Sequence, residues 1–148
     1  MRLTLLILTT LILTGCLSST DFQPWQGQRE FVGKGGACTT KDGIDIWTVG
    51  EPQGRFEVLG VAENTVISDG LTVMLLGDWW SNSAIVDKAK ELGADAVIFA
   101  GPNQIKTHSR ETYDHATGGQ ETVSTGIGSK KAILIKYLEP DTDKEERQ

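Results

Sequence analysis

Short stretches of the chain alternate apolar and polar residues with a period of two, which is the pattern of half-buried β-strands. In the clearest stretch, 44–49, Ile44 and Ile46 share one face whereas Trp47 lies on the other. Composition and turn residues predict strands over 31–36, 44–49, 56–62, 96–100, 104–114, 120–125 and 131–138. The apolar run 71–76 fits either a further strand or the beginning of a helix.

A helix is predicted after the segment Ser81-Asn82-Ser83, whose side chains suit an N-cap. Apolar residues then recur at helical spacing up to Leu92, and Gly93 suits the left-handed conformation that ends a helix. We therefore expect one principal helix over about 82–92. Together, this helix and the predicted strands indicate an α+β fold. We expect a single small domain in which a mostly antiparallel sheet of four to six strands carries the helix on one face.

The first residues have the layout of a secretory signal. Arg2 provides a positive end, an apolar run covers 3–13, and Leu13-Thr14-Gly15-Cys16 resembles the lipobox of bacterial lipoproteins. A membrane span would need roughly 20 apolar residues, and polar residues follow Cys16 almost at once. We expect residues 1–15 to be a signal peptide and Cys16 to carry a covalent lipid that anchors the mature chain to a membrane, with no other cofactor.

The lipobox resemblance also implies a location and a division of the chain. Position 17 is leucine rather than aspartate, and in lipoproteins of this kind that implies export to the outer membrane, with the domain facing the periplasm. The polar segment 16–30 is predicted to be a lipidated tether. We expect 31–138 to form the periplasmic domain and 139–148 to be a disordered acidic tail.

Charge and cysteine content narrow the range of partners. The formal net charge of the chain is −6 and becomes −7 once the signal peptide, with Arg2, is removed. An acidic domain without a basic cluster repels phosphate, so nucleic acid is not an expected partner. With lipid on Cys16, Cys38 is the only thiol left. It is either a buried small apolar residue, which we favour, or a free thiol that pairs between molecules.

A resemblance to a known group rests on the end of the predicted helix. The segment Lys90-Glu91-Leu92-Gly93-Ala94-Asp95-Ala96-Val97-Ile98 follows Leu59-Gly60-Val61 and precedes the strand 131–138. In this order it resembles small bacterial envelope domains that include the YbjQ-like domains and the RcsF-like outer-membrane stress-sensor lipoproteins. The resemblance covers 44–138 and implies a fold rather than a chemistry. The chain lacks the paired disulfides of the sensor group, and no cysteine or histidine cluster carries over metal binding from the YbjQ-like group.

Tryptophans are the most informative candidates for a binding surface. Trp79 and Trp80 are adjacent, so their rings point apart, and we expect one ring in the core and the other exposed as an anchor for a partner. Core packing of both rings is the alternative. Trp47, on the face opposite Ile44 and Ile46, is a second candidate for the same surface.

Candidate chemistry is sparse elsewhere. His108, Glu111, Asp114 and His115 form a His/carboxylate cluster, and His108, Asp114 and His115 are weak candidates for metal ligands. On a strand, positions 108 and 114 share a face and 115 lies on the other, so a solvated hairpin is favoured and no metal is expected. The glycine-rich segments 33–36 and 126–130 lack the spacing of a phosphate loop. Without a nucleophile–base pair, an enzyme is not expected.

These observations predict a non-enzymatic outer-membrane lipoprotein that binds another envelope protein in a stress-sensing or assembly role. The alternative is a small-molecule or metal-binding periplasmic lipoprotein that uses the hairpin 108–115, and an enzyme with an unrecognised site is a third. An exposed apolar patch that includes Trp79 or Trp80 would favour the first. A pocket with convergent polar groups would favour the second.

Overall fold

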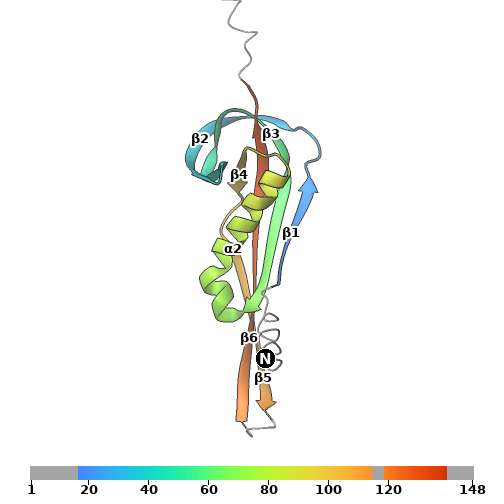
Figure 1. Ribbon diagram of the computed structural model, residues 1–148, viewed down its shortest axis with the longest axis vertical. Helices are drawn as coiled ribbons and strands as arrows, with labels where there is room; N and C mark the ends of the chain where they lie inside the picture. Colours follow the sequence, from blue (N-terminus) through green and yellow to red (C-terminus); the bar gives the residue numbers. More distant parts are fainter. Residues whose placement is uncertain (1–16, 115–118, 140–148) are drawn as a thin grey trace, which may run out of the picture.

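The computed structural model describes residues 17–114 and 119–139. They form one helix and a six-stranded sheet whose neighbouring strands are mostly antiparallel (Figure 1). The elements are β1 (Leu17–Pro24), β2 (Glu30–Lys41), β3 (Ile44–Asp69), α2 (Gly70–Glu91), β4 (Ala96–Phe99), β5 (Gln104–Asp114) and β6 (Gly119–Tyr137). The predicted α+β fold, with four to six strands and the principal helix on one face of the sheet, is therefore confirmed.

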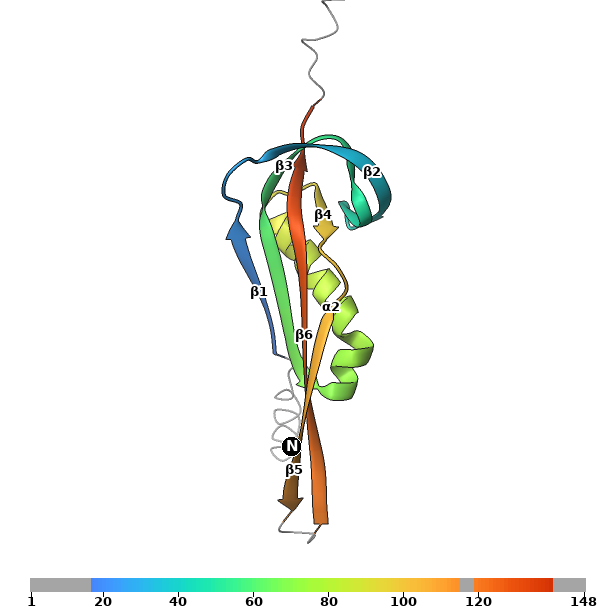
Figure 2. The same ribbon diagram turned by 180° about the vertical axis from the view of Figure 1, so that it is seen from behind.

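Two long strands, β3 and β6, form the axis of an elongated molecule, and α2 covers one side of them (Figures 1 and 2). The second half of β3 pairs antiparallel with β6, up to Asp69 opposite Thr125. Strand β1 pairs antiparallel with the other edge of β3 and begins with Leu17 opposite Ile67. The part of β6 before Thr125 pairs with β5 alone, and the two form a hairpin that projects past the rest of the sheet (Figure 1).

Strands β2 and β3 form a hairpin that curls over one end of the sheet (Figure 2). Its turn, Asp42-Gly43, has positive φ at both residues, 54° and 82°, as a tight two-residue hairpin turn requires. Strand β3 then bends at Gly50, where φ is 78° and an added Cβ would lie 2.6 Å from the carbonyl oxygen of Gly35. Glycine tolerates both the dihedral and the close approach. The bend lets the beginning of β3 pair in parallel with β4 while its end pairs with β6.

Apolar side chains form clusters on opposite faces of the sheet. The cluster between the sheet and α2 contains the buried residues Ile44, Ile46, Ala62, Ile85, Val86, Ala89, Ala94, Val97, Ala132 and Leu134. The cluster inside the curl of β2 and β3 contains the buried residues Phe56, Val58, Ala96 and Ile135, with Trp25, Phe31, Trp47, Ile98 and Ile133 packed against it. Neighbours in β4 belong to different clusters because successive side chains of a strand point to opposite faces.

The prediction of a tether over 16–30 is wrong for its first part, because Leu17–Pro24 form strand β1. This edge strand is mostly exposed and lacks the apolar alternation that would have indicated it. Asn64 of β3, which is fully buried, holds it: Nδ2 of Asn64 lies 3.0 Å from Oγ of Ser18, 3.0 Å from the carbonyl oxygen of Ser19 and 2.9 Å from Oγ1 of Thr20. The domain therefore extends at least to Leu17. Cys16, the predicted signal peptide and residues 140–148 lie outside the described residues.

Helix α2 begins at Gly70 rather than near residue 82, so the predicted start is wrong. The side chain of Asp69 is the N-cap and accepts a hydrogen bond from the backbone N–H of Thr72 at 2.9 Å. The apolar run 71–76, which fitted either a strand or a helix, is therefore helical. Ser81, which belongs to the segment predicted as N-cap, is fully buried in the middle of the helix.

The end of α2 agrees with the sequence. Gly93 adopts the predicted left-handed conformation, with φ of 68°. The N–H of Ala94 donates to the carbonyl oxygen of Ala89 at 2.9 Å, and the N–H of Gly93 donates to that of Lys90 at 3.1 Å. These two bonds form a Schellman motif, which satisfies carbonyl groups that the helix itself leaves unpaired.

Replacing Asp69 with alanine is expected to destabilise the protein at neutral pH and to have little effect well below pH 4. Hydrogen bonds from the side chain and the backbone N–H of Thr72 hold the pKa of the Asp69 carboxyl below its ordinary value. A carboxyl with a lower pKa in the folded chain contributes stability above its unfolded pKa, and this contribution is lost as the pH falls through the folded pKa. Urea unfolding across this pH range measures the effect. Asp87→Ala, farther along the helix, is the control, and an Asp69→Ala effect that is equal at pH 7 and pH 2 would contradict the capping role.

Candidate functional site

The first half of α2 carries large apolar side chains that face solvent. Leu71, Met74, Leu75 and Trp79 are 62–66% exposed and Leu76 is 45% exposed. Residues three, four and eight positions apart lie on one side of a helix, so Leu71, Met74, Leu75 and Trp79 form a continuous row that Leu76 widens. We call these five residues the α2 strip.

The opposite side of the same half-helix carries small residues. Gly70, Val73, Gly77 and Ser81 are buried and face the sheet. On β6, an added Cβ at Gly126 would lie 3.0 Å from Cα of Gly70 and 3.0 Å from Cβ of Val73. The helix therefore lies so close to β6 that leucine or tryptophan would not fit between them.

This arrangement reverses the usual polarity of a surface helix, which buries its large apolar residues and exposes polar ones. The monomer leaves half or more of the surface of most of these side chains in water. Covering each of them would contribute roughly 1–2 kcal/mol before the costs of association are subtracted. Monomeric proteins carry few contiguous apolar patches of this kind, and such patches commonly mark interaction sites. The α2 strip is therefore the candidate functional site.

Replacing Gly126 with valine is expected to displace the first half of α2 and to destabilise the fold by about 1–3 kcal/mol, as overpacking of a tight contact does. Thr125→Val is the matched control, because Thr125 is exposed beside Gly126 and the substitution keeps the β-branched shape. The midpoint of urea unfolding measures both. A Gly126→Val protein as stable as the wild type would show that α2 does not pack closely on β6.

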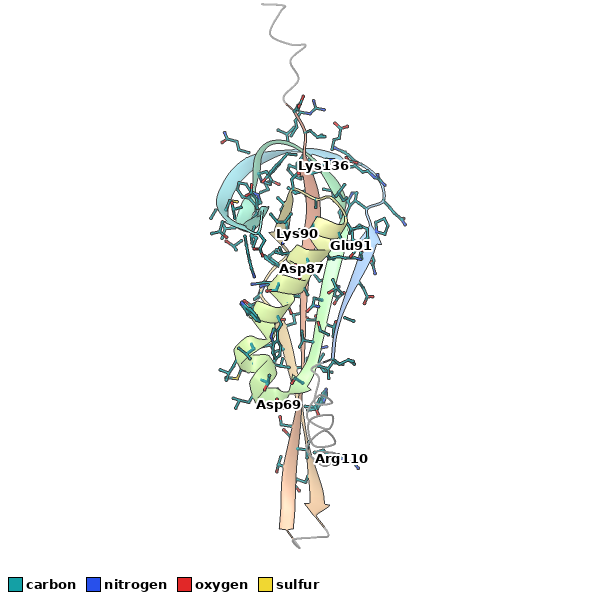
Figure 3. All side chains as sticks on the ribbon, viewed as in Figure 1. Asp69, Asp87, Lys90, Glu91, Arg110 and Lys136 are labelled. Atoms are coloured by element: carbon teal, nitrogen blue, oxygen red, sulfur yellow. The ribbon has the colours of Figure 1, made fainter. Side chains whose placement is uncertain are left out.

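Charged residues lie beside the α2 strip and follow it along the helix. Nζ of Lys130, a buried residue of β6, lies 2.6 Å from Oδ1 of Asp78 and 4.3 Å from the centre of the Phe99 ring, so this ion pair ties the middle of the helix to the sheet. Nζ of Lys41 lies 5.9 Å from the centre of the Trp79 ring, within the range of a cation–π contact. In the second half of the helix, charged residues such as Asp87, Lys90 and Glu91 occupy the outer surface (Figure 3).

The structure separates the three tryptophans predicted as partner-binding residues. Trp79 is 62% exposed in the α2 strip, whereas Trp80 is partly buried and belongs to neither of the two apolar clusters described above. Trp47 does not join them, because it packs in the cluster inside the curl, on the face of the sheet away from α2. There its indole Nε1–H donates to the hydroxyl of Tyr137 at 3.2 Å, and that hydroxyl donates to Oδ2 of Asp45 at 2.8 Å.

Four members of the α2 strip, Leu71, Met74, Leu75 and Leu76, were not predicted as site residues. Their signal was present in the apolar run 71–76, which is solvent-facing only if it belongs to a helix that begins before it. Asp69, with Thr72 three residues later, marks that beginning. The segment 81–83 concealed it, because it offers three N-cap side chains in a place where the helix continues.

Two of the predicted metal ligands, His108 and Asp114, belong to strand β5. His108 is exposed on β5 opposite Thr125, and Asp114 ends the same strand, six residues and about 20 Å farther along. His115 lies outside the described residues. Among the residues whose side chains are described, 17–111 and 122–139, no three His, Cys, Asp or Glu residues gather in a group that could hold a metal ion. The glycine-rich segments 33–36 and 126–130 lie within strands β2 and β6.

Two groups with nucleophilic atoms lie near one another but are not activated. Cys38 is an exposed free cysteine rather than the buried one expected, and desolvation followed by the nearby Asp45 carboxylate raises the pKa of its thiol. Desolvation likewise raises the pKa of the Tyr137 hydroxyl to about 12, with Asp45 contributing. Both groups therefore stay protonated near neutral pH, which makes each a poor nucleophile.

In comparisons with models of protein families, with curated proteins and with solved structures, nothing matches this chain. The resemblance of the segment Lys90–Ile98 to the YbjQ-like and RcsF-like envelope domains is accordingly a prediction from the sequence alone. In the described part of the chain, no helix is long and apolar enough to cross a membrane.

Proposed function

We propose that this protein is a lipid-anchored outer-membrane lipoprotein, without enzymatic activity, whose domain faces the periplasm and binds another envelope protein through the α2 strip. Participation in stress sensing or in assembly of an envelope complex fits such a role. The observation that carries the proposal is the reversed polarity of the first half of α2, with small residues packed on β6 and five large apolar side chains left to solvent. A protein partner with a complementary apolar groove is the occupant that best suits a row of helical anchors.

The anchor would be the lipidated Cys16, the first residue of the mature chain. Since Leu17 already belongs to β1 and lies opposite Ile67, a lipid on Cys16 leaves no spacer between membrane and sheet. Across the sheet, Leu17 lies level with Ile67 of β3, Ile127 of β6 and Lys106 of β5. From Lys106 the hairpin extends a further eight residues, about 26 Å, along β5. The hairpin carries charged residues such as Arg110 (Figure 3). Because the interior of a bilayer excludes charged side chains, the domain would lie along the membrane surface rather than upright on it.

A photo-crosslinking residue placed in living cells tests the role of the α2 strip. The probe replaces Leu75, at the centre of the strip, and in a matched control it replaces Asp87, which is exposed on the same helix twelve positions later. Crosslinked products are separated by size and identified by mass spectrometry. We expect one discrete product at position 75 that contains another envelope protein, and no corresponding product at position 87.

The other outcomes of this experiment each reject the proposal in a recognisable way. Crosslinks to lipid alone would make the strip a membrane-contacting surface, and crosslinks only to a second copy would make it a dimer interface. The same product at both positions would show that contact with the partner is not specific to the strip. The absence of products would show that the strip is uncovered in the cell.

A further inference from the structure

A pocket lies on the other side of the sheet from the α2 strip, inside the curl of β2 and β3. It is a pocket of about 260 Å³, open to solvent. Its walls are almost entirely apolar, and three of them are aromatic rings: Trp25, Phe31, Gly50, Glu51, Phe56, Val58, Ile98 and Ile133 line it. The volume suits a molecule of roughly the size of a single amino-acid side chain or a small amine.

The aromatic rings are held in fixed positions. Phe31 and Phe56 are stacked with ring centres 6.0 Å apart, and Trp25 meets Phe31 edge to face at 6.5 Å. The indole Nε1–H of Trp25 donates to the carbonyl oxygen of Gln28 at 2.8 Å, which fixes that ring as well. The pocket is thus formed before a ligand arrives, which reduces the ordering cost of binding.

Glu51 is the one charged residue that lines the pocket. Its Oε1 accepts a hydrogen bond from the backbone N–H of Lys34 at 3.3 Å, and among residues 17–114 and 119–139 no lysine or arginine side chain forms an ion pair with it. A carboxylate at an aromatic pocket disfavours anions and attracts cations. Aromatic faces add to that attraction, because the ring quadrupole presents its negative face to the cation.

We propose that this pocket binds a small organic ammonium cation, with its apolar substituents against the rings of Trp25, Phe31 and Phe56 and its charge near the Glu51 carboxylate. Aromatic walls with an adjoining carboxylate are the chemistry by which proteins recognise quaternary ammonium groups. The cation is either a free metabolite or the headgroup of a lipid, since both present the same group. The site is separate from the α2 strip and does not depend on the function proposed for it.

Calorimetric titration with choline, using the mature protein in a non-ionic detergent, tests the proposal. The comparison ligand is 3,3-dimethylbutan-1-ol, which has the shape of choline but no charge. We expect choline to bind in the millimolar range or tighter and the alcohol to bind at least about fivefold more weakly, because only choline gains the electrostatic terms. Equal binding of the two ligands would show a merely apolar pocket, and binding of neither would overturn the proposal.

Substitution of the carboxylate locates the binding. Glu51→Gln is expected to weaken choline binding about fivefold or more and to leave binding of the alcohol unchanged. Glu91→Gln, the same substitution at an exposed position of α2 outside the pocket (Figure 3), should change neither. If both variants bind choline like the wild type, the cation binds elsewhere and the proposed site is wrong.

Flotation with vesicles distinguishes the two sources of the cation. The Cys16→Ser protein, which cannot take a lipid on residue 16, is mixed with phosphatidylcholine or phosphatidylglycerol vesicles. Flotation with phosphatidylcholine alone, lost in a Cys16→Ser/Glu51→Gln protein, would support a headgroup as the ligand. Choline binding without flotation would support a free metabolite, and flotation that Glu51→Gln leaves unchanged would contradict headgroup binding in this pocket.

Discussion

The Cys16→Ser protein is expected in the soluble fraction of lysed cells, whereas the wild type is expected in the membrane fraction. Cysteine supplies the sulfur to which the lipid would be attached, and serine offers no such sulfur. Because two acyl chains hold a protein on a membrane stably, we predict a nearly complete change of fraction. Membrane fractionation, together with metabolic labelling by an alkyne-tagged fatty acid, measures it.

The chain offers a matched control for this substitution. Cys38→Ser removes the other cysteine, which is an exposed free thiol in β2, and we expect that protein to stay on the membrane and to take up the fatty-acid label. Cys16→Ser protein that stays in the membrane fraction would contradict lipid anchoring. Loss of the label from the Cys38→Ser protein would show that the lipid is attached to Cys38 and not to Cys16.

Ile85→Ala is expected to destabilise the protein by about 3–4 kcal/mol, whereas Leu75→Ala on the same helix is expected to change stability by less than about 0.5 kcal/mol. Ile85 is fully buried between α2 and the sheet, and Leu75 is 66% exposed in the α2 strip. The contrast follows from burial alone, because the two residues are isomers of equal size. Urea unfolding of the two variants and the wild type measures it.

This pair of substitutions examines the orientation of the first half of α2. A large loss of stability in Leu75→Ala would mean that this side of the helix is buried in the monomer, and the α2 strip would not exist as a surface. An Ile85→Ala protein as stable as the wild type would mean that Ile85 is not buried between α2 and the sheet. The measurement needs no knowledge of a partner.

Much of the fold could be predicted because local signals agreed with tertiary packing. Strand β5 has the predicted bounds, 104–114, since turn residues stand on both sides of it in the sequence, Gly101-Pro102 before it and Gly118-Gly119 after it. Gly93 ends the helix as predicted, since its left-handed φ is a local property. Strand β1 was missed because it is an exposed edge strand, and what holds it is the side chain of Asn64, 44 to 46 residues away in the sequence. Contacts of that range leave no periodic pattern in the strand they hold.

The candidate site could be predicted only in part, for the same reason. Trp79 was a candidate because it is a tryptophan next to Trp80 in the sequence. The rest of the α2 strip depends on the helix beginning at Gly70. Its outward orientation depends further on Gly126 of β6, which admits only small residues beneath the helix. The aromatic pocket was not predicted at all, because Trp25 and Phe31 come from segments read as a tether and a short strand and meet Glu51 only through the curl of β2 and β3.

The dissociation constant between this protein and the protein crosslinked at position 75 tests the proposed role of the α2 strip most directly. Purified components are compared for the wild type, for Leu75→Gln/Trp79→Gln in the strip, and for Val49→Gln, which alters a residue of β3 that is 68% exposed. We predict that the strip variant weakens binding by a factor of about 30 or more, as loss of central apolar anchors does, and that Val49→Gln changes it less than about twofold. A strip variant that binds as tightly as the wild type would contradict the proposed function.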